Sequence, residues 1–134
     1  MPKLHRVGAI IQNGKDIVLI HRFKGSQEYY AIPGGNIDHG ETPDIAILRE
    51  VDEELGLHLD KCKFVLEVND NDRQDFYFSC TTTDTDFVVT GDEKNYLNDP
   101  EKLFEPQWIN KKNINNNIQI YPENGRELIY KTLK

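Results

Sequence analysis

The chain has 134 residues, of which 37% are hydrophobic and 29% charged, a composition that suits one globular domain over residues 1–134. Its 23 acidic and 16 basic side chains give a formal net charge of −7, which argues against a basic surface for duplex nucleic acid. No stretch approaches the roughly 20 apolar residues of a membrane span, and the first residues lack a signal-peptide core, so we expect a cytoplasmic protein with no membrane contact.

The first third of the chain is predicted to form strands. Apolar residues at 4–11 and 17–20 flank Asn13-Gly14, a dipeptide that tolerates positive φ and closes hairpins. Residues 29–32 form a third extended run, and Pro33 disfavours helix just before Gly34-Gly35. Because glycine lets a backbone approach its neighbours closely, we expect a glycine-lined loop at 34–35.

A helix is predicted over Pro43–Leu55. Thr42 offers an N-cap hydroxyl, and Pro43 suits the first helical position. Gly56 then supplies the signal that ends the helix.

The remaining elements are predicted from hydrophobic period and turn residues. In chain order they are strands at 61–68 and 74–81, a short extended piece at 87–90, a polar loop at 92–100, the end of a strand at 107–109, an irregular turn at 113–117 and a helix over 123–133. Cys62 and Cys80 lack the spacing of metal motifs, so we expect both to be buried thiols in strands.

Three glutamates share one stripe of the predicted helix. Spacings of three and four residues return Glu50, Glu53 and Glu54 to one side at ~100° per residue. We expect the acidic side to stay accessible and the sheet to receive the opposite, apolar side, which carries Ile45, Leu48, Val51 and Leu55.

The acidic stripe admits two interpretations. Like charges at these spacings destabilise a helix by a few tenths of a kcal/mol per pair, so the stripe favours a compensating cation such as Mg²⁺, which prefers oxygen ligands. Arg49 stands four residues before Glu53 and can orient its carboxylate. The simpler interpretation is a solvated acidic face.

The residues around this helix resemble the Nudix box. From Gly35 the chain reads G-x5-E-x7-R-E-V-D-E-E-L-G-L, which fills every fixed position of the family pattern G-x5-E-x7-R-E-U-x-E-E-x-G-U, with U apolar, over residues 35–57. The strand order and small size also resemble a small MutT-like Nudix domain across nearly the whole chain. The resemblance implies an α/β fold in which a mixed sheet lies between helices, an α/β/α sandwich.

The resemblance also implies a reaction. Nudix hydrolases cleave a nucleoside diphosphate linked to another group, using water and Mg²⁺ or Mn²⁺. By position in the motif, Arg49 resembles an orienting residue and Glu41 a brace between loop and helix. The positions that resemble metal ligands are the backbone oxygen of Gly34 and the side chains of Glu53 and Glu54, with Glu50 as a further ligand or the base.

Two alternatives stay open. In some Nudix enzymes the base is a glutamate on a later loop, for which Glu93, Glu101 and Glu105 are candidates, each with a solvated loop charge as the simpler interpretation. A second hypothesis is a Nudix-fold nucleotide-binding or sensor module that does not cleave its ligand. Such modules usually lose a box carboxylate, whereas this chain keeps them all.

The oligomeric state is expected to be a monomer or a homodimer.

Recognition of the nucleotide must come from residues outside the box. Aromatic rings can stack on a base, and basic side chains can meet distal phosphates. The candidates are Arg22, Lys24, Tyr30, Phe76 and Trp108, with Tyr29 and Phe78 as further aromatic candidates. In the strand at 74–81, Phe76 and Phe78 share one face and Tyr77 the other, so one of these faces belongs to the core.

The position of prolines bears on the substrate. Family members that prefer ADP-ribose often carry a proline soon after the box, and none occurs here between Pro43 and Pro100. This pattern favours nucleoside triphosphates or other nucleotide derivatives over ADP-ribose.

Overall fold

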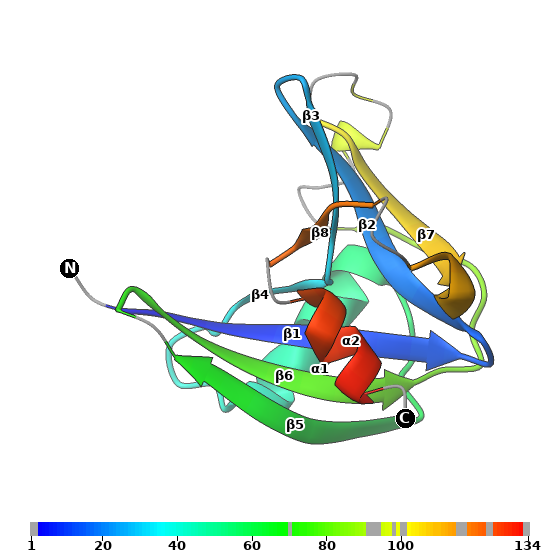
Figure 1. The fold of residues 1–134 in the computed structure, drawn as a ribbon. Coiled ribbons are helices and arrows are strands. Elements are labelled where there is room, and N and C mark those ends of the chain that lie inside the picture. The colour runs from blue at the N-terminus through cyan, green and yellow to red at the C-terminus, as the bar shows by residue number, and fades with distance from the viewer. Residues whose placement is uncertain are drawn as a thin grey trace.

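A mixed β-sheet lies at the centre of the computed structural model (Figure 1). The structure describes residues 3–69, 71–90, 95–97, 99, 102–114, 118–122 and 125–132, without the side chains of Lys24 and Arg126. The elements are β1 (Leu4–Asn13), β2 (Asp16–Lys24), β3 (Gln27–Ala31), β4 (Gly34–Asn36), α1 (Pro43–Leu55), β5 (Lys61–Asn69), β6 (Arg73–Thr81), β7 (Phe104–Asn110), the short 3₁₀ helix η2 (Lys111–Asn113), β8 (Ile120–Tyr121) and α2 (Gly125–Thr132).

The sheet has the strand order β5-β6-β1-β2-β3-β8, with β4 also paired to β1 and β7 to β2. The pairs β1–β6 and β3–β8 are parallel, and the other pairs are antiparallel. The predicted first hairpin is confirmed, because Gly14 has φ of +61° and Gln12 pairs with Ile17. In Figure 1 the sheet curls, so that β2, β3 and β7 rise away from β1, β5 and β6.

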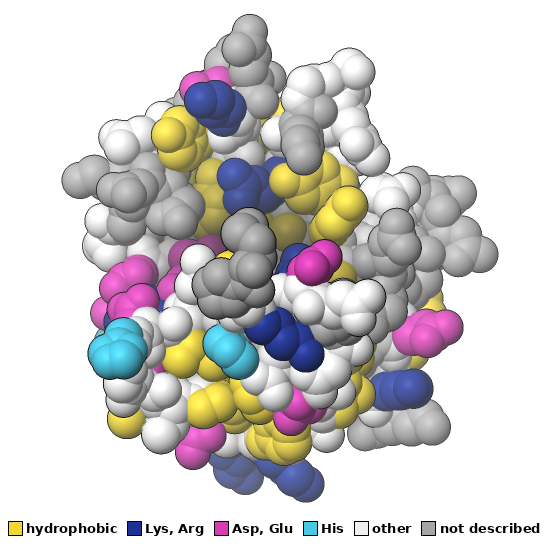
Figure 2. All heavy atoms as spheres, turned by 90° about the vertical axis from the view of Figure 1, so that its left-hand side faces the viewer, with side chains coloured by type: hydrophobic (Ala, Val, Ile, Leu, Met, Phe, Trp, Pro, Cys, Tyr) yellow, Lys and Arg dark blue, Asp and Glu magenta, His cyan; other side chains and the backbone are white. Residues whose placement is uncertain are grey.

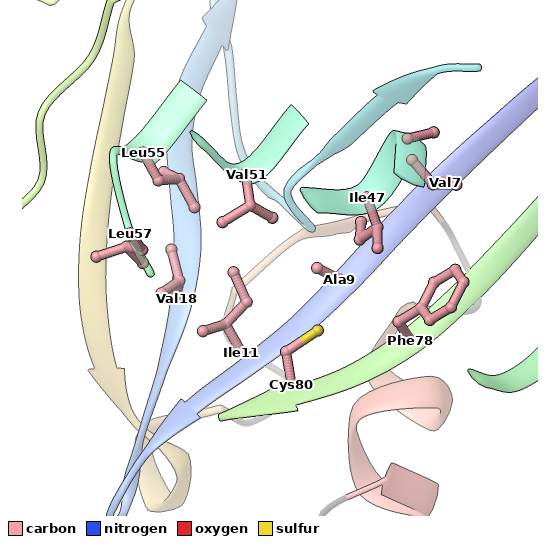
Figure 3. Close-up of a cluster of buried hydrophobic side chains, with 11 residues drawn as sticks. Val7, Ala9, Ile11, Val18, Ile47, Val51, Leu55, Leu57, Phe78 and Cys80 are labelled. Carbon is pink, nitrogen blue, oxygen red and sulfur yellow. The ribbon is translucent and has the colours of Figure 1, made fainter. Parts of the chain in front are cut away.

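Each face of the sheet has its own hydrophobic cluster, as strand alternation requires. On one face Val7, Ala9 and Ile11 of β1 pack with α1 (Figure 3). On the other face Ile10 and Tyr77 pack with Leu128 and Ile129 of α2. Helices therefore cover both faces of a mixed sheet, which confirms the predicted α/β/α sandwich.

Helix α1 has the predicted bounds, but its N-cap differs from the prediction. Thr42 has the extended backbone of an N-cap residue, yet its side chain makes no capping hydrogen bond. Gly56 ends the helix with φ of +66°, and its backbone N–H donates to the carbonyl oxygen of Asp52 at 2.9 Å. Glycine suits this left-handed position because it carries no Cβ.

The buried side of α1 agrees with the prediction in part, because Val51 and Leu55 are buried as expected. Ile45 and Leu48, expected to pack on the sheet, are 57% and 51% exposed. The buried side chains are Ala46, Ile47, Val51, Glu54 and Leu55. At ~100° per residue these positions centre near Ile47 and Glu54. Glu54 is therefore on the buried side and Glu50 lies against β4, whereas Glu53 stays half exposed.

Two predicted irregular or extended segments also differ. The predicted loop at 34–35 is strand β4, in which Gly34 pairs with Gly8 of β1. A Cβ on Gly34 would overlap the carbonyl oxygen of Val7, so the close approach of β4 to β1 requires glycine. Residues 87–90 join no strand: the backbone N–H of Val88 donates to the Leu55 carbonyl at 2.8 Å and thereby closes the end of α1.

Other elements follow the predictions with shifted ends. Strand β7 is longer than the predicted 107–109, and α2 lies within the predicted 123–133, whose first and last residues are outside the described ranges. Most of the predicted loop at 92–100 also lies outside them. In the described part of the chain, no helix has the length and apolar character needed to cross a membrane.

Candidate functional site

Arg49 ties the loop before α1 to the helix itself. Its Nε and Nη2 donate to the two carboxylate oxygens of Glu41 at 2.7 and 2.9 Å, and Nη2 also donates to the Asn36 carbonyl at 2.9 Å. Glu41 in turn accepts a hydrogen bond from the backbone N–H of Asp38 at 2.8 Å. Glu41 is thus a brace between loop and helix, as the family pattern implies.

These contacts shift the proton affinity of both partners. The hydrogen bonds from Arg49 and from the backbone N–H of Asp38 hold the pKa of Glu41 below its ordinary value. The hydrogen bonds to Glu41 and Glu50 raise the pKa of Arg49 above its already high value. Arg49 therefore carries a permanent positive charge in the middle of the acidic residues.

Glu50 lies directly over β4. Its side chain is 14% exposed, and it accepts a hydrogen bond from Nη1 of Arg49 at 2.9 Å. A Cβ on Gly35 would overlap the Glu50 carboxylate, so the absence of a side chain at Gly35 makes room for it. The second glycine of β4 thereby brings strand backbone and helix carboxylate into close contact.

Glu53 and Glu54 differ in exposure. The Glu53 side chain is 49% exposed and lies 3.4 Å from Nη1 of Arg49, whereas Glu54 is 6% exposed. Among the described residues, no group of three or more His, Cys, Asp or Glu side chains converges to hold a metal. In this arrangement Arg49 supplies the positive charge between Glu50 and Glu53.

The donor atoms on this side of α1 nevertheless fit a hard divalent cation. Carboxylates at Glu50, Glu53 and Glu54 and a backbone carbonyl at Gly34 would all offer oxygen, the ligand atom that Mg²⁺ and Mn²⁺ prefer. The half-exposed Glu53 can change rotamer without disturbing the core, because it is held by one long contact to Arg49.

A cavity of about 190 Å³ adjoins the other glycine of β4. Gly34 lines it, together with residues of β1, β2, β3, β6 and β8. Its polar lining consists of Arg6, Arg22, Arg73 and Asp75, and its aromatic lining of Tyr29, Tyr77 and Tyr121. On the face that carries the start of β1 and β6, Figure 2 shows basic side chains among hydrophobic ones near the middle and a group of acidic side chains to the left.

The cavity has an excess of positive charge. Arg73 donates to both carboxylate oxygens of Asp75, at 3.1 and 2.9 Å, and Nε of Arg6 lies 3.9 Å from the same carboxylate. Among the described lining residues a single acid thus faces several arginines, and Asp75 is itself buried. A ligand group with negative charge or several acceptor atoms suits such a lining.

Arg22 and Tyr77 add donors to this cavity. Nε of Arg22 is buried and has no hydrogen-bond partner among the described residues, while its guanidinium lies 5.3 Å from the centre of the Phe104 ring. Burial and the nearby Asp75 charge raise the pKa of Tyr77 to about 12. Tyr77 therefore keeps its hydroxyl proton near neutral pH.

The structure separates the predicted substrate-binding residues. Arg22 lines the cavity, and the Lys24 side chain lies outside the described atoms. Tyr30 stacks on His21 with ring centres 4.8 Å apart, and Phe76 packs on the α1-side cluster. Trp108 stacks on Phe87 at 5.4 Å and donates its Nε1–H to the Thr85 carbonyl at 2.8 Å. Tyr30, Phe76 and Trp108 are not in the cavity lining.

Sequence reasoning did not identify several lining residues. Arg6 and Tyr121 carry no local signal, because only the pairing of distant strands brings them together. Strand alternation offered a partial signal for Arg73, Asp75 and Tyr77, which occupy the face of β6 opposite Phe76.

Of the loop acids considered as bases, one can be placed. Glu105 belongs to β7, and its carboxylate contacts Nδ1 of His21 at 3.3 Å. Glu93 and Glu101 lie outside the described residues. The choice between Glu50 and these acids as the base stays a prediction.

Comparison with known proteins gives the family. The model of the NUDIX domain matches residues 2–129. The chain is 39% identical over 62 residues to an RNA pyrophosphohydrolase from Saccharophagus degradans, covering 46% of this chain and 34% of that protein. It is 42% identical over 66 residues to an ADP-ribose pyrophosphatase from Methanocaldococcus jannaschii, covering 46% of this chain and 37% of that protein. These alignments thus span little more than a third of either relative.

The fold agrees with this match. A structure from a study of MutT from Aliivibrio salmonicida and Vibrio cholerae superposes with a TM-score of 0.72 at 19% identity, covering 98% of each chain. At this identity the likeness concerns the fold. Because the family model spans nearly the whole sequence, the chain belongs to the NUDIX family.

Proposed function

We propose that the protein is a Mg²⁺-dependent pyrophosphohydrolase that cleaves the diphosphate of a nucleoside triphosphate or another nucleotide derivative. The observation that carries this proposal is the position of β4. Gly34 lines the arginine-rich cavity, and its neighbour Gly35 contacts Glu50 of α1. A nucleotide bound in the cavity can therefore extend its diphosphate past β4 to the acidic helix.

The acidic side of α1 would hold the metal through Glu53, Glu54 and the Gly34 carbonyl, with Glu50 as a further ligand or the base. When bound, Mg²⁺ or Mn²⁺ offsets the charge of the diphosphate and lowers the pKa of a water molecule. As the base, Glu50 would accept a proton from the attacking water, and the position of its carboxylate over β4 supports this role. Arg49 keeps Glu50 in position by its hydrogen bond from Nη1.

The cavity would hold the nucleoside part. At about 190 Å³ it is smaller than the roughly 300–1,000 Å³ of sites that enclose a whole drug-sized ligand, so it suits one part of a nucleotide. Tyr29 offers aromatic surface for a base or ribose, and the largely buried Tyr77 forms part of the cavity wall. Arg22 offers a buried donor without a partner among the described residues, which a phosphate or base oxygen can satisfy.

Hydrolysis is favoured over ligand sensing because the box is complete. A module that only binds a nucleotide has no need of carboxylates beside its ligand, since they repel the phosphates. Here Glu50, Glu53 and Glu54 are all present on α1, and Glu50 lies against β4.

A substrate screen tests the proposal. Purified protein is incubated with nucleoside triphosphates, nucleotide sugars, dinucleoside polyphosphates and ADP-ribose, with and without Mg²⁺, and the products are identified by mass. We expect turnover of at least one nucleotide class that stops when Mg²⁺ is removed and that Glu53→Gln abolishes. Tight nucleotide binding without turnover would support the sensor hypothesis instead. Calorimetry showing no association of Mg²⁺ or Mn²⁺, with or without nucleotide, would contradict both metal site and reaction.

A further inference from the structure

The two cysteines of the chain face each other across strands β5 and β6. Cys62 and Cys80 are direct partners in this antiparallel pair, and their Sγ atoms are 2.8 Å apart. Directly opposed residues in antiparallel strands have Cα atoms about 4.5–5.5 Å apart, which lies within the range of about 4.4–6.8 Å that a disulfide spans. The register therefore places the two Cα atoms within the span of a disulfide, with the two sulfurs already in contact.

The two thiols differ in their surroundings. Cys62 is exposed, because β5 is an edge strand with β6 as its one neighbour in the sheet order. This exposure contradicts the expectation that both cysteines are buried. Cys80 is fully buried in the cluster beneath α1, and Figure 3 shows its sulfur among Ile11 and Phe78. An oxidant in solution can thus reach the sulfur of Cys62, whereas the sulfur of Cys80 is shielded from solvent.

The same difference assigns a chemical role to each thiol. The hydrogen bond between the two sulfurs lowers the pKa of Cys62, while that bond and burial raise the pKa of Cys80. The thiolate is the nucleophilic form of cysteine, so Cys62 is the more reactive of the two.

We propose that Cys62 and Cys80 form a redox modification site, which a hydroperoxide converts into a reversible disulfide between β5 and β6. The Cys62 thiolate attacks the peroxide, forming a sulfenic acid and releasing hydroxide or alkoxide. Sγ of Cys80 then attacks the Cys62 sulfur, the S–O bond breaks, and the Cys80 proton leaves with the hydroxyl group as water. Overall the two thiols lose two electrons and two protons, and the peroxide O–O bond is reduced.

The disulfide would change the stability of the protein more than its hydrolase activity. The two cysteines are 18 residues apart in sequence, so a disulfide closes a loop of that length in the unfolded chain and restricts its freedom. In the folded chain it fastens an edge strand to its neighbour. Neither cysteine belongs to the acidic helix or to the cavity lining, so the oxidised protein should keep its activity.

Thiol counting under controlled oxidation tests the proposal. Fully reduced protein is treated with a small excess of hydrogen peroxide, quenched, unfolded in a thiol-alkylating reagent and measured by intact mass and peptide mapping. We expect loss of both free thiols, a mass lower by two hydrogen atoms, a peptide linking Cys62 to Cys80 and full reversal by dithiothreitol. The melting temperature should be several degrees higher for the oxidised than for the reduced protein.

Matched variants separate the two roles. In Cys62→Ser the buried Cys80 should remain a thiol, whereas in Cys80→Ala the exposed Cys62 should proceed to sulfinic acid or link two chains. Neither variant should show the rise in melting temperature. The proposal is overturned if the parent protein keeps two thiols, carries only an over-oxidised Cys62 or forms only disulfide-linked dimers. Because the readouts are mass and melting temperature, their failure would leave the proposed hydrolysis unaffected.

Discussion

The two sides of β4 are built in opposite ways. On the α1 side, acidic residues gather around Arg49, and the partners of Arg49 lie between residues 36 and 53 of the sequence. On the cavity side, arginines gather from β1, β2 and β6, with tyrosines from β3 and β8. One side is thus negative and formed by neighbours in the chain, and the other is positive and formed by distant strands.

This difference suggests a division between chemistry and recognition. A phosphate-bearing substrate is repelled by the acidic side unless a cation is bound there, whereas the cavity attracts it directly. Substitutions of the proposed metal-binding carboxylates on α1 should therefore lower kcat, and substitutions in the cavity should raise KM.

The largest expected effect comes from Glu53→Gln. Replacement removes one negative metal ligand but leaves a side chain of the same size at a half-exposed position. We expect kcat to fall by at least about 100-fold at saturating Mg²⁺, with little change in melting temperature. Asp52→Asn, which removes an exposed charge one residue earlier on α1, is the control and should keep full activity. If Glu53→Gln retains turnover within about threefold of the parent, Glu53 is not a ligand.

Trp108→Ala tests whether Trp108 belongs to the cavity or to the core. Trp108 packs on the α1-side cluster, stacks on Phe87 and donates to the Thr85 carbonyl. We expect the free energy of unfolding to fall by about 2 kcal/mol, with KM unchanged. Trp108→Phe keeps a ring against Phe87 and should lose less. Denaturant unfolding measures the free energy of unfolding, and steady-state kinetics measure KM. A raised KM with unchanged stability would show that Trp108 contacts the substrate.

The same contrast explains what the sequence could predict. Helix α1 and the Glu41 brace follow from local signals, because capping residues, period and motif spacing all act within about 20 residues. The buried face of α1 was predicted correctly at Val51 and Leu55 but not at Ile45 and Leu48, because periodicity ranks apolar residues without information on which neighbour lies beside Glu50. The contact between Gly35 and the Glu50 carboxylate is a tertiary feature that periodicity does not show.

The cavity was predicted less well because it depends on strand pairing. Trp108 and Phe76 are aromatic residues in strands, as Tyr29 and Tyr77 are, and alternation separates Tyr77 from Phe76 without showing which face of the strand meets the cavity. The parallel register of β1 and β6 places Tyr77 beside Gly8, where a Cβ would come within 2.6 Å of the Tyr77 ring. That register, which joins residues about 70 positions apart, decides which aromatic faces the cavity.

Arg22→Ala should have a smaller effect, confined to binding. Its buried Nε has no hydrogen-bond partner among the described residues, so its charge-assisted hydrogen bond can be made to the substrate. We expect KM to rise about tenfold and kcat to change less than threefold. Arg22→Lys keeps the charge but loses the planar fork and should give an intermediate KM. A fall in kcat with constant KM would mean that Arg22 acts in the chemical step. That result would contradict the division between chemistry on α1 and recognition in the cavity.

Glu41→Gln gives the smallest expected effect, seen in the pH dependence of stability. The pKa of Glu41 is lowered in the folded protein by hydrogen bonds from Arg49 and Asp38, so the unfolded chain binds its proton more tightly. The resulting stabilisation is complete above the unfolded pKa of about 4.3 and is lost as the pH falls through the folded value. The parent should therefore melt at a higher temperature than Glu41→Gln near neutral pH, and the difference should shrink below about pH 4. If the difference in melting temperature stays constant from neutral to acidic pH, Glu41 acts through its shape and not through its charge. The brace would then not depend on the ion pair with Arg49.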